Sequence, residues 1–290
     1  MPPRIGITFG DSAGIGPEIV RAALASNRLL GSAQFQVIGE GSVSCPGEPS
    51  RETARGALAA LEEAVDLAKR GALDAIVTGP IHKARMYEVG FAFPGQTEFF
   101  AARYGVTDYA MLLTGGSLTV ALVTTHIPLR AVCSSLRTAE IVRVGRLLHA
   151  FLRQRHKRPP RMAVAGLNPH AGESGEMGRE EIDVITPAIA QLAEEFRERA
   201  VFAGPFSPDT IFHQAAAGAW DAVLCMYHDQ GLIPLKLHAF DQGVNVTLGL
   251  PVPRTSPDHG TAFEIAGQGM ARPDSMIAAI NLAAELARNA

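Results

Sequence analysis

The chain has 290 residues, 47% of them hydrophobic, so it can bury a large core in two domains or in one sizeable α/β unit. Its formal net charge of -3 gives no basic surface for nucleic acid or an anionic membrane, and no apolar run matches a membrane span or a signal-peptide core. Three cysteines, Cys45, Cys133 and Cys225, are too few and too scattered for a disulfide framework, so we expect reduced thiols in a cytoplasmic protein.

Short apolar runs alternate with helical patterns, which is typical of βαβ units and a largely parallel sheet. The first predicted strand, residues 5–9, leads through the glycine-rich turn 10–16 to a helix with Pro17 in its first turn. The other predicted strands are 35–38, 75–78, 110–113, 118–124, 162–167, 222–226 and 244–248. The other predicted helices are 53–69, 138–152 with Thr138 as its cap, 180–197, 208–217 and 273–288. Gly115-Gly116 predicts a hairpin, which would add an antiparallel strand.

Three histidines share one setting, in which a short apolar strand gives way to a polar or proline-containing turn. They are His126, His170 and His228. An α/β protein binds ligands beyond the carboxyl ends of its strands, so three imidazoles there can converge on one divalent metal. A single histidine at a strand end is more often structural, and the spacing matches no zinc finger. The prediction therefore depends on the repeated setting.

The glycine-rich turn lacks the spacing of a dinucleotide fingerprint, so a tight strand-to-helix turn and a ligand contact are equally good interpretations. Asp11 is its most informative residue, because a carboxylate at a strand end can orient a substrate or an imidazole. Gln96 and Thr97 stand at a predicted helix start. Thr97 is either a helix cap or, with free backbone N–H groups, part of a phosphate or carboxylate site.

Residues 227–269 set many polar groups among apolar strands and glycine turns. Lys236 and Arg254 would ordinarily be surface residues. In this setting they are candidate anion ligands, Arg254 for bidentate recognition and Lys236 as a point charge. Asn245 interrupts a β-branched run and needs a hydrogen-bond partner.

Five long motifs in order make the chain resemble the 4-hydroxythreonine-4-phosphate dehydrogenase (PdxA) family over nearly its whole length. They are GDSAGIGPE from Gly10, TTHIPL from Thr124, GLNPHAGE from Gly166, YHDQG from Tyr227 and RTSPDHGTA from Arg254. Motifs of this length are highly specific for the family and less so for its substrate.

The resemblance implies the isocitrate/isopropylmalate dehydrogenase type of fold, with two α/β/α domains and a mixed, largely parallel sheet. Residues 1–110 plus 245–290 would form a terminal domain. Residues 111–244 would form a central domain with the dimer interface, and the active site would lie in the cleft between the domains. The family's metal ligands match His126, His170 and His228, one of which crosses the interface of a homodimer.

The implied reaction is the oxidation, with decarboxylation, of 4-phosphooxy-L-threonine to 3-amino-2-oxopropyl phosphate in pyridoxal phosphate biosynthesis. The implied cofactors are NAD or NADP and a divalent ion (zinc, magnesium or cobalt), which lowers the pKa of the substrate hydroxyl. The expected substrate-binding residues are Gln96, Thr97, Lys236, Asn245 and Arg254. The expected cofactor loop contains Asp258, His259, Gly260 and Thr261.

The proton shuttle is left open between Lys236 and Asp229, and Asp11 is a further candidate catalytic residue. Two departures from the family bear on the substrate site: Gln96 stands where the family usually has His, and Ser12 where it has Pro. Glutamine cannot carry a positive charge, so phosphate binding is expected to be weaker or the substrate different. The chain is also shorter than is usual for the family between Gly39 and Thr53.

Three other functions fit parts of the pattern. A related dehydrogenase could oxidise another hydroxy acid, such as a phosphorylated four-carbon sugar acid or a dihydrodiol carboxylate, and Gln96 favours it. A metal-dependent hydrolase would use the histidines to activate water, but it leaves residues 258–262 without a role. A non-catalytic metal-binding or anion-binding protein would not need so many placed polar groups.

Overall fold

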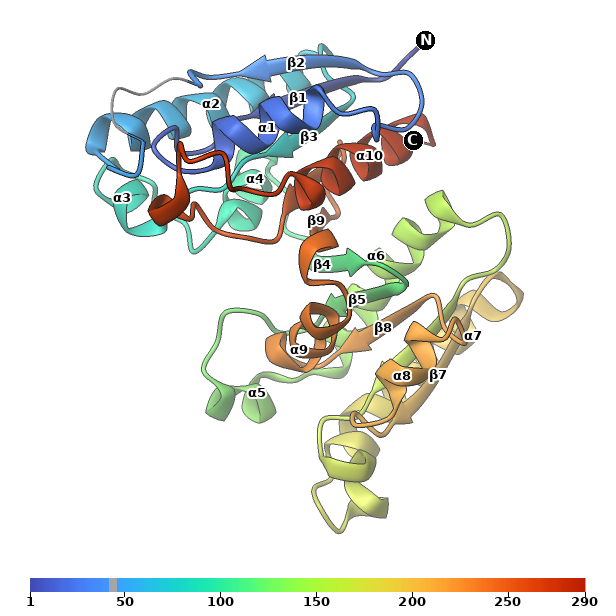
Figure 1. Ribbon diagram of the computed structural model, residues 1–290. Helices are drawn as coiled ribbons and strands as arrows, with labels where there is room; N and C mark the ends of the chain where they lie inside the picture. Colours follow the sequence, from blue (N-terminus) through green and yellow to red (C-terminus); the bar gives the residue numbers. More distant parts are fainter. Residues whose placement is uncertain (42–45, 290) are drawn as a thin grey trace. The chain divides into compact units, whose positions relative to one another are not determined.

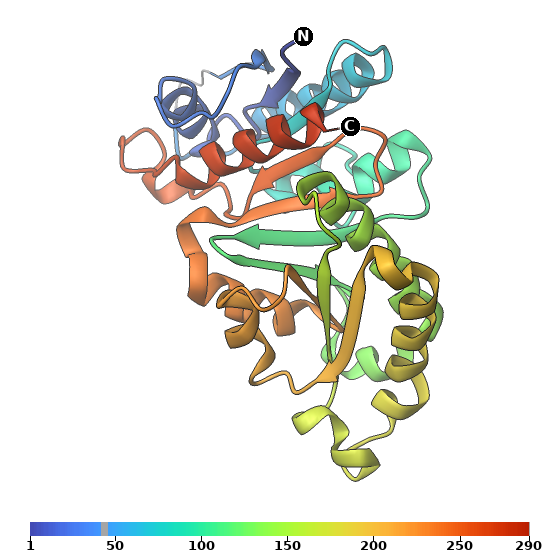
Figure 2. The same cartoon turned by 90° about the vertical axis from the view of Figure 1, so that its right-hand side faces the viewer.

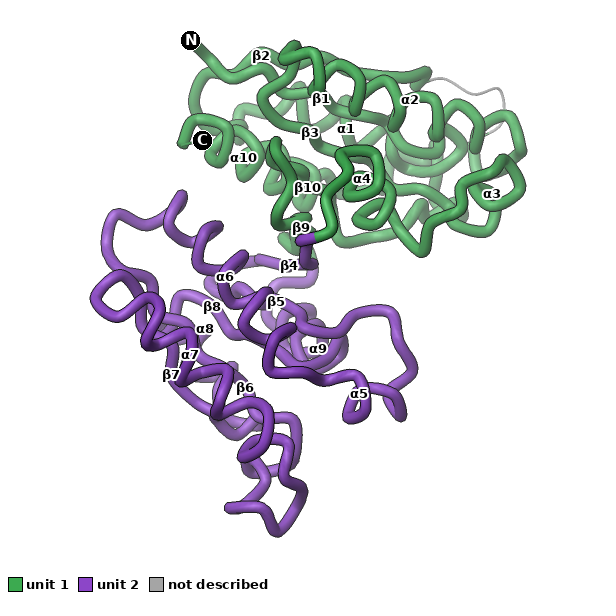
Figure 3. Tube along the Cα trace, turned by 180° about the vertical axis from the view of Figure 1, so that it is seen from behind, with its two compact units in different colours: residues 1–107, 241–290 green, residues 108–240 purple. Residues whose placement is uncertain are grey.

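The computed structural model describes residues 1–41 and 46–289 and divides into two compact units (Figure 3). The first unit contains Met1–Thr107 and Asp241–Ala290, and the second contains Asp108–Phe240. Cys45 and part of the short segment between Gly39 and Thr53 lie outside the described residues. Each unit is a mostly parallel sheet with helices on both faces, which confirms the predicted α/β fold class.

The sheet of the first unit has the strand order β2-β1-β3-β10-β9. Its strands are β1 (Arg4–Thr8), β2 (Gln34–Ile38), β3 (Ala75–Thr78), β9 (Val244–Leu248) and β10 (Arg254–Pro257). All neighbouring pairs are parallel except β10 and β9, which are antiparallel. The carboxyl ends of β1, β3 and β10 therefore share one edge, where the glycine-rich turn begins.

The helices of the first unit are α1 (Gly16–Leu24), α2 (Arg51–Lys69), α3 (Lys83–Tyr87), α4 (Gln96–Tyr104) and α10 (Asp274–Arg288). A capping box between Ser50 and Thr53 starts α2. Helix α2 packs on one face of the sheet, where Leu61 meets Ile76 and Phe100 in the core. Helix α10 covers the other face and contacts α1 (Figure 1).

The sheet of the second unit has the strand order β4-β5-β8-β6-β7. Its strands are β4 (Ala110–Gly115), β5 (Leu118–Leu122), β6 (Arg161–Ala165), β7 (Val201–Phe206) and β8 (Ala222–Cys225). The pair β4–β5 is an antiparallel hairpin with Gly116 at φ +57°, which confirms the predicted antiparallel strand. The strands β5, β8, β6 and β7 are parallel and end at one edge.

The helices of the second unit are α5 (Leu129–Ser135), α6 (Thr138–Arg155), α7 (Thr186–Phe196), α8 (Ile211–Ala216) and α9 (His228–Ala239). Helices α8 and α9 cover one face, where Leu232 and Leu235 of α9 pack against Val120 and Val223. Helix α6 crosses the other face, and α7 runs alongside β7 (Figure 2). None of the helices in the described part of the chain is long and apolar enough to span a membrane.

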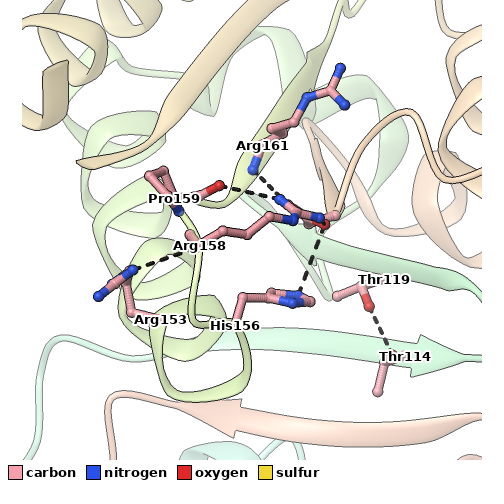
Figure 4. A network of polar contacts seen from close by, with 8 residues as sticks. Thr114, Thr119, Arg153, His156, Arg158, Pro159 and Arg161 are labelled. Atoms are coloured by element: carbon pink, nitrogen blue, oxygen red, sulfur yellow. Dashed lines mark hydrogen bonds and ion pairs between the residues drawn. The ribbon is translucent and has the colours of Figure 1, made fainter. Parts of the chain in front are cut away.

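Each sheet is clamped where its parallel strands begin. In the second unit the Asp221 carboxylate accepts hydrogen bonds from the Arg161 amide at 2.7 Å and from the Arg158 guanidinium at 2.5 and 2.8 Å. Figure 4 shows the two donor residues, Arg158 and Arg161, in this network. In the first unit Asp74 accepts from the amide of Arg4 at 2.7 Å and from its guanidinium. Both clamps lie at the opposite end of the strands from the predicted ligand-binding edges.

Several elements differ from the sequence prediction, and the short helices α3 and α5 were not predicted. Helix α9 was not expected, because Gly231 and Pro234 interrupt its pattern and its apolar residues form no single stripe. Strands β7 and β10 were also missed, since both contain proline. The expectation that Thr138 caps α6 is wrong: Arg137 is the N-cap residue, and the Thr138 hydroxyl donates to the Val184 carbonyl.

Candidate active site

Three adjacent parallel strands of the second unit carry the predicted metal-binding histidines to one edge of the sheet. His126, His228 and His170 follow the carboxyl ends of β5, β8 and β6, which are neighbours in that order. Beyond the strands, the Met226 carbonyl accepts hydrogen bonds from the amide of Thr124 at 3.2 Å and from its hydroxyl at 2.8 Å. The turns of His126 and His228 are therefore held side by side.

The His126 and His228 rings lie next to one another, with their centroids 5.7 Å apart. A cavity of about 480 Å³ is lined by both histidines and by Thr125, Ile127, Leu129, Val132, Tyr227, Asp229 and Ile233. A histidine nitrogen binds zinc at about 2.1 Å, so two imidazoles at this separation can share one divalent ion.

Asp229 fixes the orientation of the His228 ring. The Asp229 carboxylate lies 2.7 Å from Nδ1 of His228, the first residue of α9. A carboxylate on Nδ1 holds the tautomer and leaves Nε2 as the ring nitrogen available to a ligand. Asp229, one of the two predicted proton shuttles, is thus placed as a partner of His228. Lys236, the other, is half-buried about two turns further along α9.

Gln230 ties the turn of His228 to the neighbouring strand. Its buried side chain accepts a hydrogen bond from the Met226 amide at 2.6 Å and donates one to the Gly166 carbonyl at 2.6 Å. Since Met226 follows β8 and Gly166 follows β6, this one amide bridges two strand ends. Gln230 carries no sign of this role in the sequence, where it stands between more reactive neighbours.

His170 lies in a turn with an unusual backbone. Five successive residues are left-handed: His170 (φ 52°), Ala171 (φ 55°), Gly172 (φ 79°), Glu173 (φ 42°) and Ser174 (φ 60°). Only one of them is glycine, and each of the others costs about 1–2 kcal/mol in this conformation. Such strain persists only where the surroundings fix the backbone, and it is concentrated at functional sites.

The His170 ring, like that of His228, has a carboxylate at Nδ1, but His170 does not lie beside the other two histidines. Its Nδ1 lies 2.6 Å from the Glu173 carboxylate, so Nε2 is again the nitrogen left for a ligand. The side chain is 59% exposed. Within the described residues no three His, Cys, Asp or Glu side chains are grouped so as to hold a metal ion. One copy of the chain therefore pairs His126 with His228 and leaves His170 outside such a group.

In the first unit, several of the predicted substrate-binding residues gather around Arg254. The Arg254 guanidinium donates to the Gln96 side-chain oxygen at 3.0 Å and to the Thr247 hydroxyl at 3.4 Å. The hydroxyls of Thr97 and Thr247 are 3.2 Å apart. Asn245 and Thr247 are two residues apart on β9, so their side chains lie on the same face of the sheet. Arg254 of β10 is paired directly with Thr247 and shares that face.

Arg254 is a buried cation among mainly neutral groups. Its side chain is 2% exposed, and burial lowers its pKa to about 9, an effect that the Glu98 charge only partly offsets. The guanidinium is still charged at neutral pH. Within the described structure, Nε of Arg254 and Oδ1 of Asn245 are buried without a hydrogen-bond partner. A buried charge with spare donors suits an anion such as a phosphate or a carboxylate.

The predicted cofactor loop packs against the glycine-rich turn of the first unit. The Ile15 amide donates to the Thr261 carbonyl at 2.9 Å, and a Cβ on Gly14 would lie 2.7 Å from that oxygen. Only glycine allows this close approach. Asp11 is 1% exposed and its carboxylate accepts from the Ala13 amide at 3.0 Å, so it closes the same turn.

Two other residues of the loop, Asp258 and His259, make contacts with backbone carbonyls. Nδ1 of His259 contacts the Gly260 carbonyl at 3.1 Å, while its Nε2 is buried without a hydrogen-bond partner among the described residues. The Asp258 amide donates to the Gly243 carbonyl at 3.2 Å. A cavity of about 250 Å³ beside the turn is lined by Ser12, Gly14, Pro17, Glu18, Arg21, Gly41, Pro46 and Gly267.

Sequence reasoning missed four polar residues that organise these sites: Thr78, Thr247, Glu181 and Gln230. Thr78 accepts from the Arg254 guanidinium at 2.5 Å. Both threonines are polar residues within short apolar strands, a signal that could have placed them in the anion site. Glu181 stands in a polar stretch that resembles an exposed helix start, and the sequence carries no sign of its burial.

Comparison with known proteins gives one consistent result. Residues 18–283 match the family described as pyridoxal phosphate biosynthetic protein PdxA. The 4-hydroxythreonine-4-phosphate dehydrogenase of Zymomonas mobilis is 42% identical over 324 aligned positions, which cover 98% of this chain and 96% of that protein.

Solved structures agree with the sequence comparison. The crystal structure of 4-hydroxythreonine-4-phosphate dehydrogenase from Klebsiella pneumoniae is 38% identical with a TM-score of 0.82, and covers 98% of this chain and 99% of that one. A terephthalate 1,2-cis-dihydrodiol dehydrogenase from Burkholderia xenovorans is 28% identical with a TM-score of 0.70 and covers 98% of both chains. An isocitrate dehydrogenase from Methylococcus capsulatus, 17% identical with a TM-score of 0.52, shares the fold, which confirms the predicted fold type.

Proposed function

The chain belongs to the pyridoxal phosphate biosynthetic protein PdxA family, and we propose that it oxidises 4-phosphooxy-L-threonine with NAD or NADP and a divalent metal. Hydride leaves the carbon that bears the substrate hydroxyl, and the hydroxyl proton passes to the protein. The resulting 3-keto acid loses carbon dioxide, and the carbon that carried the carboxylate takes up a proton to give 3-amino-2-oxopropyl phosphate. The observation that carries the proposal is that the His126 and His228 rings lie side by side, with the Asp229 carboxylate hydrogen-bonded to Nδ1 of His228.

Arg254 is the proposed main ligand of the substrate phosphate. Its buried guanidinium has a donor to spare, and Gln96, Thr97 and Asn245 surround it with neutral hydrogen-bonding groups. A bound phosphate would supply the negative charge that this buried cation lacks, so the site favours a dianionic substrate over its unphosphorylated form.

His126 and His228 are the proposed metal ligands in one subunit, and the donor set fits a divalent ion. Two imidazoles lie within reach of one ion, and Asp229 leaves Nε2 of His228 available. A divalent ion held there would lower the pKa of the substrate hydroxyl and favour hydride transfer. Because Asp229 already partners His228, we assign the removal of the hydroxyl proton to Lys236.

The proposed cofactor site is the loop of Asp258, His259, Gly260 and Thr261. The buried, unpartnered Nε2 of His259 and the close packing of the loop on Gly14 support this assignment. NAD or NADP bound there would accept the hydride.

We further propose a homodimer in which His170 of one subunit completes the metal site of the other. Within one chain His170 is 59% exposed and belongs to no metal-binding group among the described residues. Large apolar side chains are exposed on the second unit, which is typical of an interface, and two of them, Leu129 and Ile233, line the cavity of the histidine pair. They are Leu129, Ile233, Leu237 and Phe240, exposed by 69%, 66%, 89% and 75%.

The test is a substrate comparison with the purified protein, NAD or NADP and a divalent ion. We expect reduced nicotinamide to form with 4-phosphooxy-L-threonine and at least 100-fold less efficiently with 4-hydroxy-L-threonine, which lacks the phosphate; the loss of one charge-assisted anion contact costs about 1.5–3 kcal/mol and a phosphate makes several. Equal efficiency with the two substrates would contradict the phosphate assignment.

A second candidate function is the oxidation of a dihydrodiol carboxylate. The likeness to the terephthalate dihydrodiol dehydrogenase over 98% of the chain favours it, as does neutral Gln96 in the anion site. A carboxylate needs less positive charge than a phosphate dianion. Turnover of terephthalate dihydrodiol in the same assay, without turnover of 4-phosphooxy-L-threonine, would replace the first assignment with this one.

A further inference from the structure

The left-handed turn that carries His170 is anchored by one buried carboxylate, that of Glu181. Glu181 is 3% exposed and begins the π-helical turn Glu181–Ile185 ahead of α7. One of its oxygens accepts hydrogen bonds from the backbone amides of Leu167 and Asn168, both at 2.7 Å. Its other oxygen accepts from the Asn168 side chain at 2.9 Å. These contacts fix the chain immediately before the turn.

The turn is also closed tightly over this carboxylate. A Cβ on Gly172 would lie 2.6 Å from a Glu181 oxygen, and one on Gly166 would lie 3.2 Å from the other oxygen. The only glycine among the five left-handed residues is therefore the one that meets Glu181. Glu181 fills the space under the turn, and the strained backbone of residues 170–174 closes over it.

We propose that Glu181 is a positioning residue for His170, which it presents outward with Nδ1 held by Glu173 and Nε2 free to bind the metal. The inference rests on the proposed metal role of His170. Glu181 touches neither the metal nor the substrate in this scheme. It acts by holding a backbone conformation that Ala171, Glu173 and Ser174 would not adopt alone.

Glu181→Gln is the sharpest variant, because it keeps the shape of the side chain. One oxygen remains for the two amides, but an NH2 group replaces the oxygen that faces the Asn168 NH2 group. The matched control is Glu180→Gln. The neighbouring Glu180 also accepts from the Asn168 side chain, at 2.8 Å, but it contacts neither backbone amide.

The first measurement is Co²⁺ binding to the metal-free, full-length protein, followed by the visible absorption spectrum of the bound ion. We expect Glu181→Gln to weaken Co²⁺ binding by about 10- to 100-fold, as is usual when a supporting residue of a metal ligand is lost. Its spectrum should change in the same way as that of His170→Ala, which loses the ligand. Glu180→Gln should stay within about twofold of the parent protein.

The second measurement is amide hydrogen exchange across residues 167–177 in the same proteins. Faster exchange in Glu181→Gln, with parent rates in Glu180→Gln, is expected if the carboxylate anchors the turn. If Glu181→Gln is too unstable to purify, Gly172→Ala disturbs the same contact from the side of the turn and should give the same two results.

The two measurements separate this inference from the proposed function. Parent-like Co²⁺ binding and exchange in Glu181→Gln, while His170→Ala binds weakly, would overturn the role of Glu181 and leave His170 as a ligand. Parent-like Co²⁺ binding in His170→Ala would overturn the ligand assignment on which the inference rests, whatever the exchange rates.

Discussion

Arg254 keeps its charge although its side chain is only 2% exposed, and this combination has a thermodynamic consequence. Burial lowers its pKa from 12.5 to about 9, so the folded state disfavours the charged form relative to the unfolded chain. The resulting cost to stability is present below about pH 9 and is relieved as the pH rises above the folded pKa. An anion bound beside Arg254 would relieve the same cost at neutral pH.

The prediction at this site is that inorganic phosphate stabilises the parent protein but not Arg254→Met. At a phosphate concentration 100 times its dissociation constant, ligand linkage adds about 2.7 kcal/mol to the free energy of unfolding. Thermal unfolding with and without phosphate measures the effect. Arg103→Met is the control, because Arg103 pairs with Glu62 and is 38% exposed. An equal response to phosphate in Arg254→Met would place the anion elsewhere.

At the residue scale, the sequence predicted where the polar side chains of the sites would lie, but it did not predict the backbone conformation that positions them. The strand-end settings of His126, His170 and His228 follow from apolar runs that stop at polar turns, a local pattern. The left-handed conformation of residues 170–174 could not be predicted, since four of the five are not glycine. It depends on Glu181, which comes later in the chain.

At the scale of elements, the clamp that Asp221 forms with Arg158 and Arg161 uses a charged side chain to hold the starts of β6 and β8 together. Burial alone would raise the pKa of Asp221, but the hydrogen bonds from Arg158 and the Arg161 amide outweigh burial and hold that pKa below its ordinary value of 3.8. A carboxyl whose folded pKa is depressed stabilises the fold above its unfolded pKa. That contribution is lost as the pH falls through the folded pKa.

We therefore predict that Asp221→Asn lowers the free energy of unfolding at pH 7 by about 1.5–3 kcal/mol, the usual contribution of hydrogen bonds to a charged group. The difference from the parent protein should shrink as the pH falls below about 4, the region where an unfolded aspartate takes up its proton. Denaturant unfolding at several pH values measures it. Asp183→Asn, at an exposed pair with Arg179, should change little. A difference that does not vary with pH would contradict the clamp.

Helix α9 and strand β10 were not predicted, because neither has the regular spacing of apolar residues on which the other predictions depended. A Cβ on Gly231 would lie 3.0 Å from a Leu122 methyl carbon and 3.1 Å from the Cys225 sulfur, so glycine lets α9 lie close against β5 and β8. Pro234 lies inside α9 and Pro257 is the last residue of β10, and proline in either setting argues against the element when only the sequence is known. Long periodic helices such as α2 and α10 depend on their own sequence and were predicted closely. Elements that form only against their neighbours were not.

At the scale of the whole molecule, the proposed homodimer makes metal binding depend on subunit association. Leu237, 89% exposed on α9, is the most exposed residue of the proposed apolar interface. Leu237→Glu should weaken the dimer at least tenfold, since burying a leucine contributes about 1.5–3 kcal/mol and burying a charge is costly. Sedimentation equilibrium measures the association.

The matched control for the interface is Leu30→Glu, at a leucine of the first unit that is 66% exposed. It should leave association unchanged. If His170 crosses the interface, Leu237→Glu should also weaken Co²⁺ binding at protein concentrations where it is monomeric. A monomeric variant that binds Co²⁺ as tightly as the parent dimer would show that one chain holds the metal alone.

The account as a whole is tested most directly by the products formed from 4-phosphooxy-L-threonine and NAD or NADP. With a divalent ion present, the protein should form reduced nicotinamide and carbon dioxide in equal amounts. Chelation should abolish both products, and His126→Ala and His228→Ala should lower their rate by at least about 100-fold at a fixed metal concentration, as expected when a ligand of the activating ion is lost. Parent rates in both histidine variants, or turnover that persists after chelation, would contradict the account.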